Sequence, residues 1–210
     1  MPLRALLADV DPAWYARDDD GQAFDPQLVA LARRSALGQR LLVRALPATL
    51  TSTLLAPRPG AAAHVAMARR WPRARLSALV RDLGILAFAP AIRGEVRREP
   101  VRWLRQVLGN GYLLALDRTV WDAQVGRDAQ ARLAADWRAL SADPAFLVDP
   151  APLGALLDLQ GRSELCVWAD ARNPALAEWA RLVQGEAPPR PAHLPDKALL
   201  RVLTHHENRD

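Results

Sequence analysis

The chain has one cysteine, Cys166, and one lysine, Lys197, among its 210 residues. A single cysteine excludes an internal disulfide and every zinc site built from several cysteines. The residues on either side of Cys166 are apolar, which is typical of a buried thiol that packs as a small hydrophobic group. Arginine supplies nearly every positive charge in a chain also rich in alanine, leucine and proline, a composition typical of a GC-rich genome. Its abundance alone therefore indicates no phosphate site.

Long apolar runs are also missing. The longest one, residues 84–92, is interrupted by Pro90 and is far shorter than the ~20 residues that a membrane span needs. The amino-terminal apolar stretch is too short for a signal peptide and leads directly to Asp9 and Asp11. We therefore expect a cytoplasmic protein without a transmembrane segment.

The alternation of apolar and polar residues that marks β-strands is almost absent. β-branched residues cluster only in residues 50–55, which are compatible with a short strand or an irregular connector. Elsewhere, apolar residues recur at helical spacing. The sequence predicts a single, mainly α-helical domain over residues 1–210, a compact multi-helix body with short irregular connectors and at most one or two short strands.

Capping residues and glycines predict where several helices begin and end. Asp25 followed by Pro26 is typical of a helix start, and it predicts a helix over residues 26–46. Gly84 lies inside a strongly apolar helical pattern, which indicates the close approach of another backbone. Gly161 is predicted to end a helix that begins near residue 150.

The carboxyl-terminal part begins with a proline-rich stretch. Residues 186–195 predict a stiff linker rather than a folded element. A helix over residues 196–205 is expected to follow. His205 and His206 lie at its end, where we expect a frayed terminus rather than a metal site.

Residues 93–111, RGEVRREPVRWLRQVLGNG, combine five arginines with Gly-Asn-Gly. Ile92 and Val96 are spaced to face inward, and Pro100 is predicted to open a helix that ends at Gly109. A phosphate-binding loop would need a G-x-G-x-x-G pattern or a following lysine, and neither is present. Gly-Asn-Gly therefore predicts a helix-ending turn.

The net charge of +5 comes from one region. Residues 69–105 hold ten arginines and three acidic residues, a balance of +7, which leaves −2 for the rest of the chain. A basic face of this kind suits an acidic protein surface or a nucleic acid. No helix-turn-helix, zinc knuckle or aromatic-basic strand motif accompanies it. Protein docking is the favoured interpretation, and a basic helical nucleic-acid-binding regulator is the alternative.

No group of catalytic residues stands out. The acidic residues between positions 117 and 143 alternate with arginines, as on a solvated helical surface. Four histidines and one cysteine offer little for acid–base or metal chemistry. We expect a binding module with no catalytic residue, metal or cofactor. An enzyme built around Cys166 and His64 is a third hypothesis.

Residues 78–108, ALVRDLGILAFAPAIRGEVRREPVRWLRQVL, resemble the core of the SctK (YscK-type) family, accessory proteins of the bacterial type III secretion sorting platform. A Pro-x-x-Tyr at residues 12–15 is also similar to that family, and the chain length agrees with it. The matching features of the core are Leu83-Gly84 in an apolar helix, Ala91-Ile92-Arg93 with Val96 one turn later, and a helix opened by Pro100.

The resemblance implies a cytoplasmic, non-enzymatic adaptor that is peripheral to the inner membrane. Such proteins link the cytoplasmic domain of the ring protein SctD to the pod protein SctQ, and through it to the stator SctL and the ATPase SctN. Charge and amphipathic shape, rather than the family, indicate six interface candidates: Trp14, Tyr15, Arg97, Arg98, Arg102 and Arg105.

Overall fold

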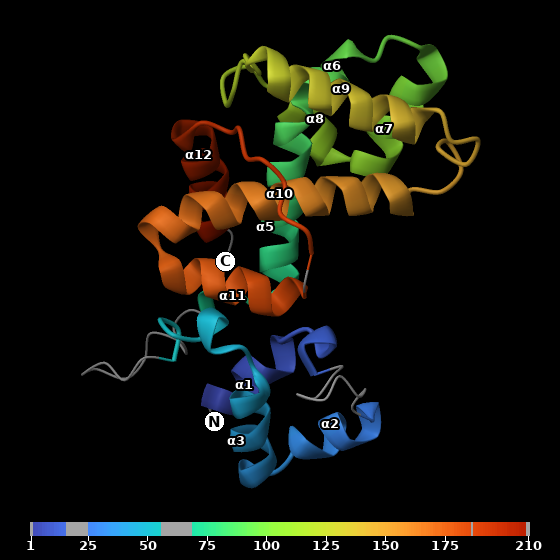
Figure 1. The fold of residues 1–210 in the computed structure, drawn as a ribbon. Helices are drawn as coiled ribbons and strands as arrows, with labels where there is room; N and C mark the ends of the chain where they lie inside the picture. Colours follow the sequence, from blue (N-terminus) through green and yellow to red (C-terminus); the bar gives the residue numbers. More distant parts are fainter. Residues whose placement is uncertain (1, 16–24, 56–68, 186, 209–210) are drawn as a thin grey trace. The chain divides into compact units, whose positions relative to one another are not determined.

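The computed structural model describes residues 2–15, 25–55, 69–185 and 187–208, which form eleven α-helices and no β-strand (Figure 1). The prediction of a mainly α-helical fold is confirmed. The chain divides into two compact units. The first unit is Met1–Ser77 with Cys166–Pro188, and the second is Ala78–Leu165 with Pro189–Asp210. The expectation of a single domain over residues 1–210 stays a prediction.

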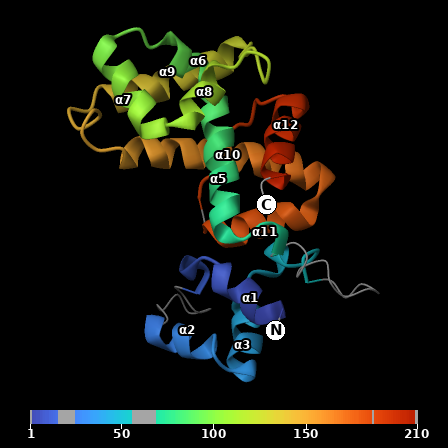
Figure 2. The ribbon, with the colours of Figure 1, turned by 180° about the vertical axis from the view of Figure 1, so that it is seen from behind.

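The first unit joins its amino-terminal helices to α11. Its elements are α1 (Pro2–Asp9), η1 (Pro12–Tyr15), α2 (Pro26–Ala32), α3 (Ala36–Ala45), η2 (Ala48–Leu50) and α11 (Pro174–Gln184). Helices α1 and α3 pack side by side, as both views show (Figures 1 and 2). The backbone N–H of Asp11 donates to the carbonyl of Leu182 at 2.8 Å, and Nε1 of Trp179 donates to the carbonyl of Trp71 at 2.7 Å. These bonds attach segments distant in sequence to α11.

The helix predicted over residues 26–46 is two helices in the structure. Asp25 caps the first one as predicted, since its carboxylate accepts the backbone N–H two residues later at 2.8 Å. Ser35 then caps α3: its backbone is extended and its Oγ accepts the N–H of Gly38 at 2.9 Å. The prediction of one continuous helix was wrong because this serine competes for the helix start.

A buried carboxylate shapes the connector that follows α3. Glu178 of α11 accepts hydrogen bonds from Oγ of Ser52 at 2.9 Å and from the backbone N–H groups of Thr53 at 2.9 Å and Leu54 at 2.6 Å. The backbone bends around this carboxylate and forms turns. Of the two conformations left open for residues 50–55, the irregular connector is the one observed.

The second unit is built around two long crossing helices. Its elements are most of α5 (Arg73–Ala87) and α10 (Ala151–Arg172), with α6 (Ala89–Gly94), α7 (Arg98–Leu108), α8 (Asn110–Leu116), α9 (Arg127–Ser141) and α12 (Asp196–Glu207). Helix α5 crosses α10 in both views (Figures 1 and 2). Buried side chains from α5 to α10 and their connections form one apolar cluster: Ile85, Phe88, Ile92, Leu104, Tyr112, Leu133, Trp137, Phe146, Leu153 and Leu157.

Two glycines let α5 and α10 cross backbone to backbone. A Cβ atom on Gly84 would lie 1.9 Å from the carbonyl oxygen of Leu157. A Cβ on Gly161 would lie 1.9 Å from the carbonyl oxygen of Val80. The close approach predicted at Gly84 is confirmed. The helix end predicted at Gly161 is wrong, because this glycine lies inside α10 and serves the same crossing from the other side.

The arginine-rich segment departs from its prediction at two places: α7 begins at Arg98 rather than at Pro100, and Val96 faces solvent. Ile92 is buried as predicted, but α6 ends at Gly94. Val96 therefore lies in the connection to α7 and is 87 % exposed, so its predicted inward orientation was wrong. Gly109, with φ of 53°, ends α7 as predicted, and α8 begins at the next residue.

The stretch predicted to be a linker has no helix or strand over residues 187–195, yet it is fastened to α10. Glu164 of α10 is 1 % exposed, and its carboxylate accepts the backbone N–H groups of His193 and Leu194, each at 2.9 Å. Nε2 of Gln160 donates to the same carboxylate at 2.7 Å. The proline-rich stretch is thus held in one conformation.

The carboxyl-terminal helix is longer and better fixed than predicted. Helix α12 continues to Glu207. His206 is 3 % exposed, and its Nε2 lies 2.8 Å from Oδ2 of Asp82 on α5. The prediction of a frayed end was wrong, because this contact fixes the last turn of α12 to α5.

Candidate protein-interaction surfaces

Helix α7 presents three arginines as one exposed row. Arg98, Arg102 and Arg105 are spaced i, i+4 and i+7, so they project from one face of the helix. Pro100 and Leu104, on another face, are buried in the second unit. These buried residues fix α7 to the core of the second unit, and the arginine row therefore lies on a helix held in place. Guanidinium groups held in this way suit the carboxylates of a partner, because each can form paired hydrogen bonds.

The arginines between residues 97 and 105 differ in the contacts that they make within the chain. Arg98 and Arg102 form no ion pair within the described part of the chain. The guanidinium of Arg105 lies 5.4 Å from the centre of the Tyr112 ring. Arg97 is paired with Glu95, with Nη2 2.7 Å from Oε2, and this hydrogen bonding lowers the pKa of Glu95. Arg97 therefore adds little charge to the row.

Arg93, the first arginine of the segment, is used inside the second unit. Its guanidinium donates to the carbonyls of Ala115 at 2.7 Å, Trp121 at 2.9 Å and Asp122 at 2.9 Å. Its partial burial lowers the pKa of this arginine. The three bonds fix the connection between α8 and α9, so Arg93 has a structural role.

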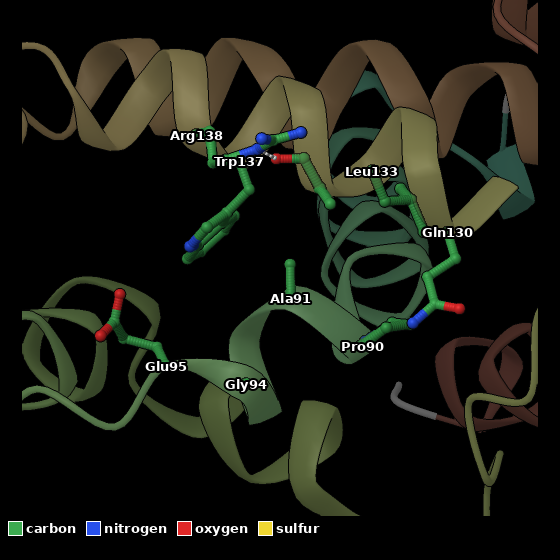
Figure 3. Close-up of a pocket in the computed structure, with 9 residues that line it drawn as sticks. Pro90, Ala91, Gly94, Glu95, Gln130, Leu133, Trp137 and Arg138 are labelled. Atoms are coloured by element: carbon green, nitrogen blue, oxygen red, sulfur yellow. Dashed lines mark hydrogen bonds between the residues drawn. The ribbon is translucent and has the colours of Figure 1, made fainter. Parts of the chain in front are cut away.

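A groove of about 250 Å³ lies between α6 and α9 (Figure 3). Trp137 projects from α9 into this space, and Ala91 of α6 points toward it (Figure 3). Polar groups stand at its edge, where Nε of Arg138 is bonded to a carbonyl of its own helix at 3.1 Å. The volume is small for a cofactor but suits one apolar side chain of a partner. Glu95 lines the groove and also pairs with Arg97 at the start of α7.

Trp14 and Tyr15, the other two interface candidates, belong to the first unit. Trp14 is partly buried, and its Nε1 donates to the carbonyl of Arg181 at 3.2 Å. Tyr15 is 1 % exposed, and the guanidinium of Arg33 lies 5.7 Å from the centre of its ring. The structure brings the four arginines together on one segment. It places Tyr15 in a core, where its ring offers no surface to a partner.

The burial of Tyr15 leads to a prediction about stability at alkaline pH. Burial raises the pKa of Tyr15 from 10.0 to about 12, and its hydroxyl bonds to none of the described residues. Above its ordinary pKa the unfolded chain loses this proton and the folded chain keeps it. The contribution is therefore intact below about pH 10, and the free energy of unfolding should fall by up to about 3 kcal/mol as pH rises to about 12.

The variant Tyr15→Phe should remove this alkaline loss. At neutral pH it should change the free energy of unfolding by less than about 1 kcal/mol, because no hydrogen bond is lost. Urea unfolding of both proteins near neutral pH and near pH 11 measures the effect. A variant as sensitive to alkali as the parent would contradict the assignment.

Four exposed leucines were not identified from the sequence. They lie on α2 and α3 in the first unit: Leu28, Leu31, Leu37 and Leu41. Their spacing is visible in the sequence. Spacing alone predicts a buried stripe, however, and only the packing of the unit decides which face of a helix meets solvent.

The described residues show no metal-binding constellation and no membrane helix. Within them, no three side chains of histidine, cysteine, aspartate or glutamate converge as metal ligands would. None of the helices in this part of the chain has both the length and the apolar composition that crossing a bilayer requires. Cys166 is buried, as predicted. His64, its partner in the enzyme hypothesis, lies outside the described residues.

Comparison with protein-family models, with curated proteins and with solved structures finds no match to this chain. The resemblance to the SctK family therefore depends on residues 78–108 and stays a prediction.

Proposed function

We propose that this chain is a non-enzymatic adaptor of the bacterial type III secretion sorting platform. It links the cytoplasmic domain of the ring protein SctD to the pod protein SctQ, and through SctQ to SctL and SctN. It works in the cytoplasm, at the inner membrane to which its partners hold it. The observation that carries the proposal is the exposed row of Arg98, Arg102 and Arg105, which lies inside the segment that resembles SctK.

Residues 78–108 contain both buried residues that hold the fold and exposed arginines that are available to a partner, and this supports the proposal. Leu83 and Ile92, two apolar positions of the resemblance, are buried and fix the helices, whereas Val96 is exposed. The guanidinium of Arg93 donates hydrogen bonds to carbonyl groups of the same unit. The exposed α7 row is what this segment offers to another molecule. An exposed cationic row and a small apolar groove in the same unit are typical of a protein that docks others, where charge directs the encounter and an inserted side chain adds affinity.

Reversing charge on the row should weaken binding to the partner that carries the complementary acidic surface. The double variant Arg98→Glu/Arg102→Glu should raise the Kd for SctD or SctQ at least tenfold, or about 1.4 kcal/mol. Titration calorimetry with each purified partner measures this. The control is Arg118→Glu/Arg127→Glu, which makes the same change in net charge at two exposed arginines of the second unit. A docking role for α7 would be contradicted if both variants weakened partner binding equally, or if neither variant weakened it.

The nucleic-acid alternative makes a different prediction for the same variants. If the row binds phosphates, the parent chain should bind a DNA or RNA duplex with an affinity that falls steeply with salt. The Arg98→Glu/Arg102→Glu variant should then lose that binding. An adaptor should bind a duplex only weakly at physiological salt. Under the same conditions it should still bind SctD and SctQ.

A further inference from the structure

Helices α2 and α3 of the first unit leave large apolar side chains in solvent. The exposed fractions are 59 % for Leu28, 59 % for Leu31, 69 % for Leu37 and 55 % for Leu41. A single exposed leucine is ordinary, since much of any protein surface is apolar. Two pairs at helical spacing, one on each of two helices that pack together, are unusual, and exposed apolar groups of this kind mark sites of association.

The packing of the first unit explains why these leucines are exposed to solvent. Helix α3 turns Gly38 and Leu42 inward, and a Cβ on Gly38 would lie 2.4 Å from the carbonyl oxygen of Ala32. Leu37 and Leu41 each precede one of these inward residues, so they lie about 100° around the helix from the buried side. Helix α2 buries none of its residues. These four leucines of the two helices are therefore left exposed.

The charged side chains that share α3 with Leu37 and Leu41 are both basic. Arg40 and Arg44 follow Leu37 and Leu41 by three residues each, so they form the neighbouring row on the exposed side of α3. Both are exposed, and neither makes an ion pair with a described residue. Between residues 25 and 55 the only acidic side chain is Asp25, which caps α2. The exposed side of α3 thus combines leucines with guanidinium groups that form no ion pair with a described residue.

We propose that this Leu–Arg face of α3, formed by Leu37 and Leu41 with Arg40 and Arg44, binds an acidic amphipathic helix of a partner protein. Such a helix supplies apolar side chains at the matching spacing and carboxylates opposite the arginines. A second copy of the chain would bring arginines against arginines, which disfavours it. An anionic lipid surface fits less well, because α2 and α3 are short and lack the tryptophan and phenylalanine of interfacial helices.

The inference goes beyond the proposed function, because it concerns the first unit and requires no contact with the α7 arginines. Its failure and the failure of the adaptor proposal are therefore separable. The chain could lose this site and still bind SctD or SctQ through α7. Conversely, the site could bind its helix in a protein that has no role in secretion.

A displayed library of random peptides tests the inference without a known partner. The library carries peptides of about 15 residues, long enough for four helical turns. It is selected on the full chain, and selection is repeated on the variant Leu37→Gln/Leu41→Gln. Both changed side chains are exposed, so the fold should persist, and circular dichroism checks this. We expect selected peptides with leucine at helical spacing and a net negative charge, whose affinity falls at least tenfold on the variant.

Matched variants and two further measurements separate the alternatives. Arg40→Glu/Arg44→Glu should weaken the selected peptides at least tenfold, whereas Leu113→Gln, at an exposed leucine of the second unit, should not. The inference is overturned if no selected peptide depends on Leu37 and Leu41, or if those that do are basic or neutral. It is also overturned if the leucine variant instead abolishes binding to phosphatidylserine vesicles, or converts a dimer to a monomer in sedimentation.

Discussion

Replacing Gly84 with alanine is expected to lower the free energy of unfolding by about 3 kcal/mol or more. The new methyl group would sit 1.9 Å from the carbonyl oxygen of Leu157, a backbone atom that cannot rotate away. Helices α5 and α10 would have to separate at their crossing, and the apolar side chains around it would lose contact. Urea unfolding followed by tryptophan fluorescence or circular dichroism measures the change.

The control for this variant is Gly94→Ala. Gly94 is the last residue of α6, and a Cβ there would meet no atom within 4 Å. Alanine is the better helix former by roughly 1 kcal/mol, so this change should be neutral or slightly stabilising. If Gly84→Ala were as harmless as Gly94→Ala, the close crossing of α5 and α10 would be wrong.

Glu164→Ala is expected to cost about 2 to 4 kcal/mol of unfolding free energy. The buried carboxylate holds the N–H groups of His193 and Leu194, and alanine would leave both without an acceptor. The stretch before α12 would detach from α10. Hydrogen exchange should report this directly, with protection lost at the amides of residues 193 and 194 before the rest of the second unit.

The comparison for Glu164 is Glu99→Ala, which removes an exposed glutamate of α7. That change should stay within about 0.5 kcal/mol, as for other surface substitutions. A similarly small effect of Glu164→Ala, with amide protection at residues 193 and 194 retained, would show that the carboxylate does not hold the proline-rich stretch. The equivalent change at Glu178 in the first unit should release residues 52–54 for the same reason.

Local signals in the sequence were sufficient for much of the helical layout. Asp25 is recognisable as a helix cap because its side chain accepts a backbone N–H near its own position in the chain, and the structure contains this bond. Gly84 was predictable because a glycine weakens the helix that contains it, and close contact with a second backbone offsets that loss. Each of these inferences needed information from a short stretch of the chain only.

The features that the sequence did not predict depend on distant partners. Gly161 has the composition of a helix end, and only the position of Val80 makes it a crossing residue. Glu164 and His206 look like solvent-exposed residues until the proline-rich stretch and α5 are in place. The candidate site divides in the same way. The helical spacing of the α7 arginines was predictable, whereas the exposure of Leu37 and Leu41 depends on which side of α3 packs inward.

The most direct measurement is reconstitution of the complex from three purified proteins: this chain, the cytoplasmic domain of its cognate SctD, and its cognate SctQ. Size-exclusion chromatography with light scattering gives the mass of what forms. An adaptor should yield a species that contains all three proteins, and SctD and SctQ should fail to associate when this chain is left out. If neither protein binds the chain, and a deletion strain still secretes normally, the proposed function is wrong.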